Sequence, residues 1–484
     1  MLIKQTLLYL PAQLVGPIFQ LVSVIAWTHF LTPERMGVFA LVMATQELAY
    51  IATMFWFTLY TMRYFDSAAT AEDRQRFLQT ESMMMAVSTA ASVIIVAALV
   101  ATVETEWTVS LVLAALSCIM TRAIITQLTD RARTAHDTLT YSILQIVWPV
   151  VGLAAGILLV AYVEQSAAMV LWGYTIAQVL TLVLAVLRLE IGWRPWQASG
   201  DIIKVALRYG LPLLAGGVFT WIASNGLRFL VEFFEGAAAV GLLTVGWALG
   251  LRAASFAAML VTAAAFPLAM RRAREGGMGE GQAQLVRNGV LLLIAMLPAS
   301  AGLWAIARPL TDLFVAAPFR EMTHAILPLA IAAGAIRALR IHFGEQVFLL
   351  HERPVVPLVN DIIDAVLSLG GAGIGLWLGG LPGSVAGATA GAGVSLVVTL
   401  ACGWHWYRYA LPFVDAIKVG VATLAMLVAV RQMPLAATLP SITIAVVVGA
   451  IVYGVVLAAL YPSAAARAFG LLLSGLRLRR AGGA

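Results

Sequence analysis

The sequence predicts an all-α polytopic membrane protein with about fourteen transmembrane helices. Apolar residues make up 61% of the 484 positions and charged residues only 11%, whereas soluble domains carry about 25% charged residues. Apolar runs of about 20 residues recur from one end of the chain to the other, which is typical of membrane-spanning helices.

The predicted spans follow from the length of each apolar run, because a helix needs about 20 residues to cross a hydrocarbon layer of ~30 Å. They cover residues 7–31, 37–60, 82–103, 107–128, 141–163, 167–189, 205–231, 237–268, 288–308, 324–350, 355–379, 382–403, 412–430 and 438–460. In the twelfth span, Gly383, Gly387 and Gly391 recur every fourth position and predict a face for close helix contact.

The distribution of basic residues predicts the orientation in the membrane. With the N-terminus inside, the outward segments carry only Arg35, Arg308, Arg320 and Arg431. All other arginines and lysines outside the spans then face inward, as the positive-inside rule requires. Both termini are therefore expected on the cytoplasmic side.

A weak internal sequence repeat predicts two similar halves. Tyr9-Leu-Pro11 in the first span resembles Tyr209-Gly-Leu-Pro212 in the seventh, and Arg131-Ala-Arg133 after the fourth parallels Glu352-Arg353 after the tenth. Two six-helix units of the same orientation would be related by an axis along the membrane normal. We therefore expect two pseudo-symmetric six-helix lobes around a central cavity. The expected ranges are an N-lobe at 1–200, a C-lobe at 201–410, two extra helices at 411–462 and a basic cytoplasmic tail at 463–484.

Apart from Arg188 and Arg208, assigned to the inner side, and Arg308, assigned to the outer side, five arginines fall inside the predicted spans. Each costs about 2.5–3.5 kcal/mol at the centre of a helix. They are Arg122, Arg228, Arg252, Arg337 and Arg340. Guanidinium groups match phosphate oxygens in two-point contacts. These arginines are therefore candidate ligands for a phosphate or diphosphate in a water-filled cavity.

Carboxylates also fall inside the spans, among them Glu47, Glu345, Asp361 and Asp364. A carboxyl group in a low-dielectric cavity can bind and release a proton near neutral pH, and the pair at 361 and 364 could equally hold sodium. They are candidate ion-coupling residues. The alternative for both sets is internal pairing of arginines with acids, and for Arg122 and Arg228 a side chain that reaches to the membrane surface.

Several function classes find no support in the sequence. The three lysines, Lys4, Lys204 and Lys418, do not follow a glycine, so there is no nucleotide-binding P-loop. The two cysteines, Cys118 and Cys402, lie in apolar runs and are interpreted as buried residues, not as a disulfide or metal site. The net charge of +6 is scattered between apolar runs, which predicts contact with lipid headgroups and not with nucleic acid. We expect no enzyme activity, metal or cofactor beyond a coupling H⁺ or Na⁺.

Three stretches carry a family resemblance. Leu31-Thr-Pro33-Glu-Arg-Met-Gly37 is similar to the turn between spans 1 and 2 of the polysaccharide-transport branch of the multidrug/oligosaccharidyl-lipid/polysaccharide exporter superfamily. Ser224-Asn-Gly-Leu-Arg228 with Ala239-Val-Gly241 resembles its span 7–8 signature. Asn360-Asp-Ile-Ile-Asp364 with the glycine-rich stretch from Gly383 resembles its span 11–12 pattern.

The resemblance implies a flippase in the bacterial inner membrane. Its substrate would be an oligosaccharide repeat unit on an undecaprenyl diphosphate carrier, destined for lipopolysaccharide or exopolysaccharide, with Arg228 as a cavity or diphosphate contact. Membrane lipids, a polymerase and other polysaccharide-synthesis proteins are the candidate partners. Two departures are Leu243, where the family commonly has tyrosine, and a span count that resembles the peptidoglycan lipid II flippases.

Two other functions remain open from the sequence. A multidrug antiporter could share this fold, although its cationic substrates would favour a cavity of carboxylates and aromatic rings over one with five arginines. A membrane polysaccharide polymerase or ligase would need a sizeable outward loop for its acceptor, and no predicted outward loop exceeds roughly 16 residues.

Overall fold

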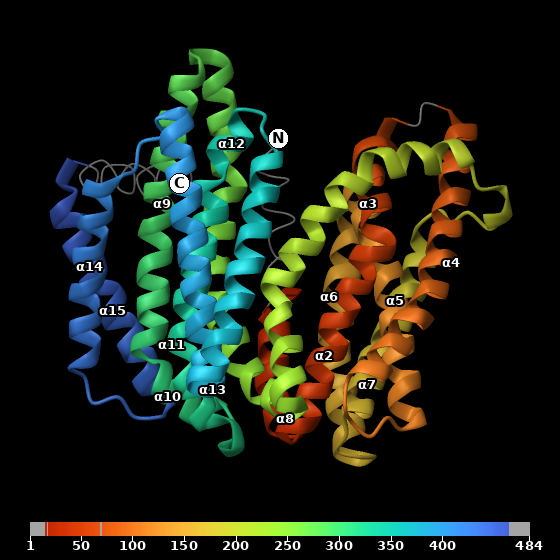
Figure 1. Cartoon of the computed structure of the whole chain (residues 1–484), viewed down its shortest axis with the longest axis horizontal. Helices are drawn as coiled ribbons and strands as arrows, with labels where there is room; N and C mark the ends of the chain where they lie inside the picture. Colours follow the sequence, from red (N-terminus) through yellow and green to blue (C-terminus); the bar gives the residue numbers. More distant parts are fainter. Residues whose placement is uncertain (1–14, 17, 68–69, 464–484) are drawn as a thin grey trace, which may run out of the picture. The chain divides into compact units, whose positions relative to one another are not determined.

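The protein is all-α, as the sequence predicts (Figure 1). The computed structural model describes residues 15–16, 18–67 and 70–463, and within these ranges there is no β-strand. The α-helices are α2 (Pro33–Tyr50), α3 (Trp56–Tyr64), α4 (Ala71–Thr102), α5 (Val109–Thr134), α6 (Thr138–Tyr162), α7 (Ala167–Arg188), α8 (Gly200–Gly276), α9 (Met278–Ala305), α10 (Ala307–Phe314), α11 (Ala317–Leu339), α12 (Gln346–Leu350), α13 (Val355–Tyr407), α14 (Phe413–Arg431) and α15 (Leu439–Leu460).

Eleven helices of the described residues are long and apolar enough to cross a membrane. Two of them, α8 and α13, are helix pairs that reverse at glycines with non-helical backbone angles: Gly236 has φ +77° and Gly380 has φ +59°. A shorter apolar helix, Ile18–Thr28, lies in the predicted first span. Each predicted span therefore has a helix, and the chain is a multi-pass membrane protein. Tyr9, Pro11 and the tail from residue 464 onward lie outside the described residues.

Four helices begin at a hydroxyl side chain that caps them. Thr32, Thr70, Thr108 and Ser166 each accept a hydrogen bond from the backbone N–H three residues later. This satisfies one of the free donors at the start of a helix, and Pro33 at the first helical position of α2 adds to the signal.

Several helices are longer than the predicted spans, and two of these differences change the place of a charged residue. Helix α4 begins at Ala71 and not at 82, and α5 continues to Thr134 and not to 128. Both helices extend past the apolar window because backbone hydrogen bonds, and not hydropathy, end a helix. This moves Glu81 and Asp130 from predicted loops into helices.

Two short π-helices interrupt the spans. One is Ile51–Phe55, between α2 and α3, and the other is Arg340–Gly344, between α11 and α12. A π-helix widens the turn and changes which side chains share a face, and such segments occur frequently at functional sites.

The chain divides into two compact units. Unit 1 comprises residues 1–248, 315–323 and 358–391, and unit 2 comprises residues 249–314, 324–357 and 392–484. Within unit 1, α6 packs along α7; within unit 2, α14 packs along α15 (Figure 1). The division into an N-lobe and a C-lobe at residue 200 stays a prediction.

The glycine face of the twelfth span makes the close contact that the sequence predicts. A Cβ atom on Gly383 would lie 2.1 Å from the carbonyl oxygen of Gly375, and one on Gly387 would lie 1.9 Å from that of Gly371. The two halves of α13 therefore touch through their backbones, which only glycine permits.

Candidate functional site

In unit 1, one face of α8 carries the polar residues of the span 7 motif. Thr220, Ser224 and Arg228 recur every fourth position and therefore share this face. The same helix is fixed to α2 by Trp221, whose indole N–H donates to the carbonyl oxygen of Ala44 at 3.0 Å. This anchor orients the polar face relative to α2.

The amide of Asn225 joins a predicted coupling carboxylate to a predicted diphosphate ligand. Its Nδ2 donates to Glu47 Oε2 on α2 at 3.2 Å, and its Oδ1 accepts a hydrogen bond from Arg228 Nη1. The sequence predicts separate roles for Glu47 and Arg228, and the structure brings them into one chain of contacts. A change in the charge of Glu47 can thus reach Arg228 through a single side chain.

The two aspartates of α13 differ in their surroundings. Asp361 is half-buried and accepts a hydrogen bond at 3.1 Å from Thr220 on the polar face of α8. Asp364 is buried and accepts one at 2.9 Å from Ser368, one turn along its own helix. Asp361 therefore contacts the helix face that also carries Arg228, whereas Asp364 is buried inside unit 1.

Arg122 lies on α5 of unit 1, over the ring of Trp148 on α6. Its guanidinium carbon is 4.0 Å from the ring centroid, a cation–π contact. One of its terminal nitrogens, Nη1, is buried and has no hydrogen-bond partner within the described part of the chain. The side chain is thus held inside unit 1, and its Nη1 can still donate a hydrogen bond to a ligand or a water molecule.

In unit 2, Arg252 and Arg337 lie near one helix crossing. A Cβ atom on Gly250 of α8 would lie 2.4 Å from the Ala330 side chain, and one on Gly334 of α11 would lie 2.9 Å from the Cα of Leu251. The two helices therefore approach closely, and each arginine follows its glycine within one helical turn. Both side chains are half-buried.

Arg340 opens the second π-helix and is already paired. Its Nη1 donates to Glu345 Oε1, and both residues are buried, at 2% and 6% exposure. The backbone N–H of Glu345 bonds to the carbonyl oxygen of Arg340 at 2.9 Å, which closes the π-turn. A diphosphate contact by Arg340 would therefore require this ion pair to open.

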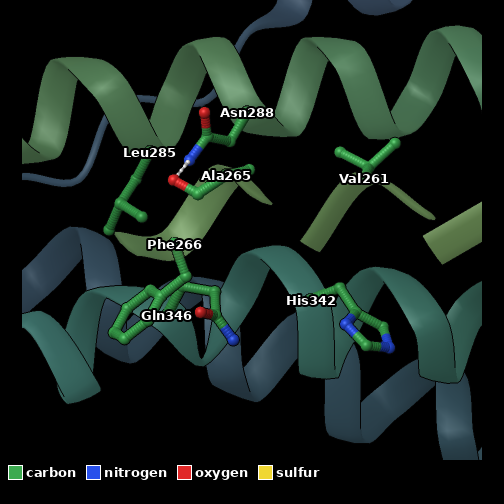
Figure 2. Close-up of a pocket in the computed structure, with 7 residues that line it drawn as sticks. All are labelled: Val261, Ala265, Phe266, Leu285, Asn288, His342 and Gln346. Carbon is green, nitrogen blue, oxygen red and sulfur yellow. Dashed lines mark hydrogen bonds between the residues drawn. The ribbon is translucent and has the colours of Figure 1, made fainter. Parts of the chain in front are cut away.

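A small pocket of unit 2 lies beside the same π-helix (Figure 2). His342 and Gln346 line one side, and Asn288 of α9 with Val261 and Phe266 of α8 line the others. The pocket has room for about one water molecule. Asn288 Nδ2 donates to the Ala265 carbonyl oxygen at 2.8 Å, so α8 and α9 are tied together at this point.

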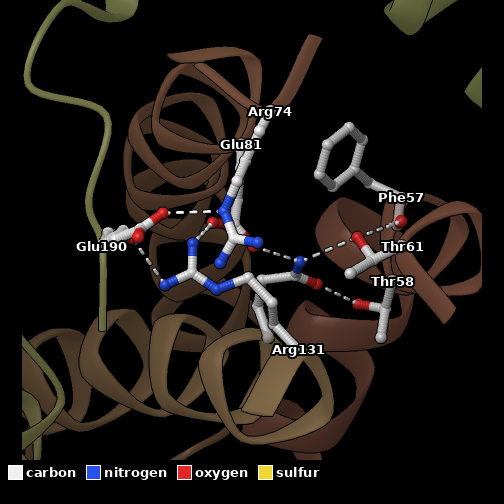
Figure 3. A network of polar contacts seen from close by, with 8 residues as sticks. Phe57, Thr58, Thr61, Arg74, Glu81, Arg131 and Glu190 are labelled. Atoms are coloured by element: carbon white, nitrogen blue, oxygen red, sulfur yellow. Dashed lines mark hydrogen bonds and ion pairs between the residues drawn. The ribbon is translucent and has the colours of Figure 1, made fainter. Parts of the chain in front are cut away.

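A buried ion pair that the sequence reasoning missed lies in unit 1 (Figure 3). Arg131 Nη1 of α5 donates to Glu81 Oε2 of α4, and the two residues are 2% and 0% exposed. Arg131 Nη2 also donates to the carbonyl oxygen of Glu190 at 2.9 Å, and the Glu190 carboxylate accepts from Arg74 Nε at 2.8 Å. Arg131 therefore forms a buried structural ion pair, in addition to its place among the inward-facing basic residues.

The pair continues into a hydrogen-bond network. Gln127 Nε2 donates to Glu81 Oε1 at 2.8 Å and to Thr61 at 3.0 Å, while its oxygen accepts from Thr58 at 2.6 Å. Tyr50, which precedes the first π-helix, donates to Thr58 at 3.1 Å.

At its other end the network reaches a further carboxylate. The Tyr50 hydroxyl also lies 3.5 Å from Asp130 Oδ2, and Asp130 pairs with Arg133 at 3.2 Å. The spacing of Gln127 and Arg131, one turn apart on α5, was the sequence signal that could have revealed this polar face.

The chain shares its family and fold with known proteins. A family model described as "Polysaccharide biosynthesis protein" matches residues 2–271. Among solved structures, the lipid II flippase MurJ in an inward closed conformation has a TM-score of 0.75 at 13% identity, and the match covers 94% of this chain and 99% of MurJ.

Multidrug transporters of the MATE family also share the fold. The transporter DinF-BH gives a TM-score of 0.57 at 14% identity over 84% of this chain and 95% of its own. A mutant of the Vibrio cholerae transporter VcmN gives 0.55 at 16% identity over 84% of this chain and 97% of its own. A search of curated protein sequences finds no match.

These matches confirm the resemblance to the exporter superfamily. Because the matched stretch covers more than half of the chain, this protein belongs to the polysaccharide biosynthesis protein family.

Proposed function

We propose that this protein is a flippase. It moves an oligosaccharide repeat unit, carried on undecaprenyl diphosphate, from the inner to the outer leaflet of the bacterial inner membrane for surface polysaccharide synthesis. Its mechanism is ion-coupled alternating access by two six-helix lobes, with both termini in the cytoplasm. The family match and the MurJ-like fold support this proposal.

The observation that carries the substrate class is the set of arginines in membrane-spanning helices. Arg252 and Arg337 follow the close crossing of α8 and α11, and Arg228 lies on the polar face of α8. Guanidinium groups at this depth are costly unless they meet water, an acid or an anion. A diphosphate offers paired oxygens to each guanidinium and compensates that cost.

The coupling step is assigned to the carboxylates. Glu47 contacts Asn225, which also binds Arg228, so protonation of Glu47 would change the hydrogen bonds available to the arginine. Asp361 binds Thr220 on the same helix as Arg228. In this proposal H⁺ or Na⁺ binds at Glu47, Asp361 or Asp364 and resets the transporter, while Glu345 opens and closes on Arg340.

The experiment is complementation of a strain that lacks its surface-polysaccharide flippase. Alanine at Arg337 should abolish surface polysaccharide while membrane levels of the protein stay normal. Alanine at Arg340 should abolish it as well, but it removes the buried partner of Glu345 and should lower the protein level. Arg271→Ala is the matched control, because Arg271 forms an exposed pair with Glu275 at 3.7 Å. Full activity of the two variants at normal protein levels would exclude the arginine site.

A multidrug antiporter is the second candidate, and the MATE matches favour it. Its cationic substrates would bind the carboxylates Glu47 and Asp361 and would be repelled by the arginines. Drug-resistance profiling of cells that express the protein separates the two functions. Resistance that depends on Glu47 and Asp361 but not on Arg228 or Arg337 would favour the antiporter.

A further inference from the structure

The segment between α7 and α8 is fastened to unit 1 at three points. The Glu190 carbonyl oxygen accepts from Arg131, as described above, and Gln79 Nε2 donates to Gln197 Oε1 at 2.9 Å. The backbone N–H of Ser199 donates to Thr80 Oγ1 at 2.9 Å. Because α4 and α5 supply these partners, residues 189–199 have a defined place on unit 1, and their outward side chains are presented in a fixed arrangement.

Two large aromatic side chains of this segment face away from the protein. Trp193 and Trp196 are 73% and 75% exposed. A tryptophan that packs in a core or an interface buries about 150–250 Å². Indoles that remain exposed in a membrane protein are enriched at the boundary between hydrocarbon and headgroups. The surroundings of these two residues are therefore expected to be lipid.

Three cations accompany the tryptophans. Arg194, Lys204 and Arg208 are exposed, and none of them forms a salt bridge with any described residue. Other exposed arginines do: Arg74 pairs with Glu190, and Arg76 pairs with Glu72. The one nearby acid on the same helix, Asp201, is exposed as well.

The start of α8 presents these cations on an amphipathic surface. Ala206 is fully buried, and a Cβ atom on Gly210 would lie 2.2 Å from the Trp56 carbonyl oxygen, so this side of the helix faces unit 1. Lys204 and Arg208 lie one turn apart, with Val205 and Leu211 exposed beside them. Exposed apolar and basic side chains together are typical of a helix that lies in the membrane interface.

We propose that Trp193, Arg194, Trp196, Lys204 and Arg208 form a binding surface for an acidic phospholipid. The three cations contact the headgroup phosphate, and the two indoles lie beside the glycerol backbone. A soluble anion would satisfy the cations but would leave both indoles in water, so a lipid headgroup is the ligand that fits all five residues. The surface lies on the connection between the two predicted repeats and fixes that connection to the membrane.

The test uses the full-length protein purified in detergent and native mass spectrometry with added phosphatidylglycerol or phosphatidylcholine. The triple variant Arg194→Gln, Lys204→Gln, Arg208→Gln removes the three cations. The matched control Arg271→Gln, Arg272→Gln, Arg274→Gln removes the same charge from the exposed C-terminal end of α8, where no tryptophan lies nearby in the sequence.

The wild-type protein should prefer phosphatidylglycerol over phosphatidylcholine. A cation near an anionic lipid surface contributes about fivefold in affinity, or about 1 kcal/mol, so the triple variant should weaken the tightest phosphatidylglycerol step by about 100-fold. The control triple should retain that step. Equal losses in both triples would mean diffuse attraction by net charge, and equal binding of the two lipids would mean no headgroup recognition; either result overturns the proposal.

A second variant tests the aromatic part separately. Trp193→Ala with Trp196→Ala should weaken both lipids to the same extent, because the indoles contact the glycerol region that the two lipids share. Unchanged binding of both lipids would remove the tryptophans from the surface and overturn the proposal as stated.

Discussion

Gly37 of α2 and Gly241 of α8 meet backbone to backbone within unit 1. A Cβ atom on Gly37 would lie 1.8 Å from the Ala237 carbonyl oxygen, and one on Gly241 would lie 1.8 Å from the Pro33 carbonyl oxygen. These glycines belong to two separate family motifs, the span 1–2 turn and the span 8 start. The two motifs are therefore two sides of one helix crossing.

Replacing either glycine should disturb this crossing. Gly37→Ala or Gly241→Ala forces the two backbones apart, and overpacking of this kind costs about 1–3 kcal/mol. We expect a lower midpoint of thermal unfolding for the purified protein. Gly420→Ala in α14 is the control, because nothing lies within 4 Å of its added Cβ atom. Equal midpoints for Gly37→Ala and Gly420→Ala would contradict the contact.

The buried pair of Glu81 and Arg131 should behave as a unit. Removing one partner leaves a buried charge uncompensated, which costs about 3–5 kcal/mol, whereas replacing both with apolar residues costs less. We expect Glu81→Leu and Arg131→Leu each to destabilise the protein more than the double variant does. Thermal unfolding of the two single variants and the double variant measures this coupling.

The matched control for that cycle is the exposed pair of Glu72 and Arg76, one turn apart on the same helix α4. Exposed pairs contribute little because water screens both charges. If the Glu81–Arg131 cycle showed no more coupling than the Glu72–Arg76 cycle, the buried pair would have no role in holding α4 to α5.

Hydropathy alone was sufficient to predict the helix-rich fold and most span positions. The break in α13 falls at Gly379 and Gly380, where the predicted span 11 ends and the gap before span 12 begins. Glu81 was missed because the predicted span begins at residue 82, one residue after it. The helix itself begins at Ala71, ten residues before Glu81. For a charged residue at the edge of an apolar run, the sequence does not show whether it lies in a loop or in a buried ion pair.

The pairing of Arg340 with Glu345 could not have been foreseen from helix geometry. Residues five apart on an α-helix point about 140° away from each other, so the two side chains would face different sides. The π-helix at 340–344 widens this turn and brings them together. Which segments form a π-helix depends on tertiary packing, and the sequence of one chain does not reveal it.

The proposed diphosphate contact of Arg337 requires a guanidinium and not merely a positive charge. Lysine at this position keeps the charge but loses the two-point geometry. Losing one charge-assisted hydrogen bond costs about 1.5–3 kcal/mol, so Arg337→Lys should reduce transport about tenfold or more. Flipping of a fluorescent lipid-linked oligosaccharide in proteoliposomes measures this. Arg320→Lys, at a residue that donates to the backbone carbonyl oxygen of Val315, is the control. Full transport activity of Arg337→Lys would contradict two-point contact and show that transport needs only a positive charge at this position.

His351 of unit 2 should make stability depend on pH. It lies just past the end of α12, its ring stacks on Tyr407 with the centroids 4.0 Å apart, and its Nε2 is 2.8 Å from Gln282 Nε2. Burial lowers the pKa of His351 below its ordinary value of 6.5. The folded state therefore binds this proton less readily than the unfolded state, so stability is full above pH 6.5 and falls as the pH drops through the lowered pKa.

The prediction is that the thermal midpoint of the wild-type protein decreases below pH 6.5 and that His351→Gln reduces this decrease. Glutamine keeps a hydrogen-bonding group opposite Gln282 but does not titrate. His405→Gln removes an exposed imidazole from the end of α13 and serves as the control. A wild-type midpoint that rises on acidification would reverse the sign and show that the ring gains a proton on folding. An unchanged slope in His351→Gln would assign the pH dependence to other groups.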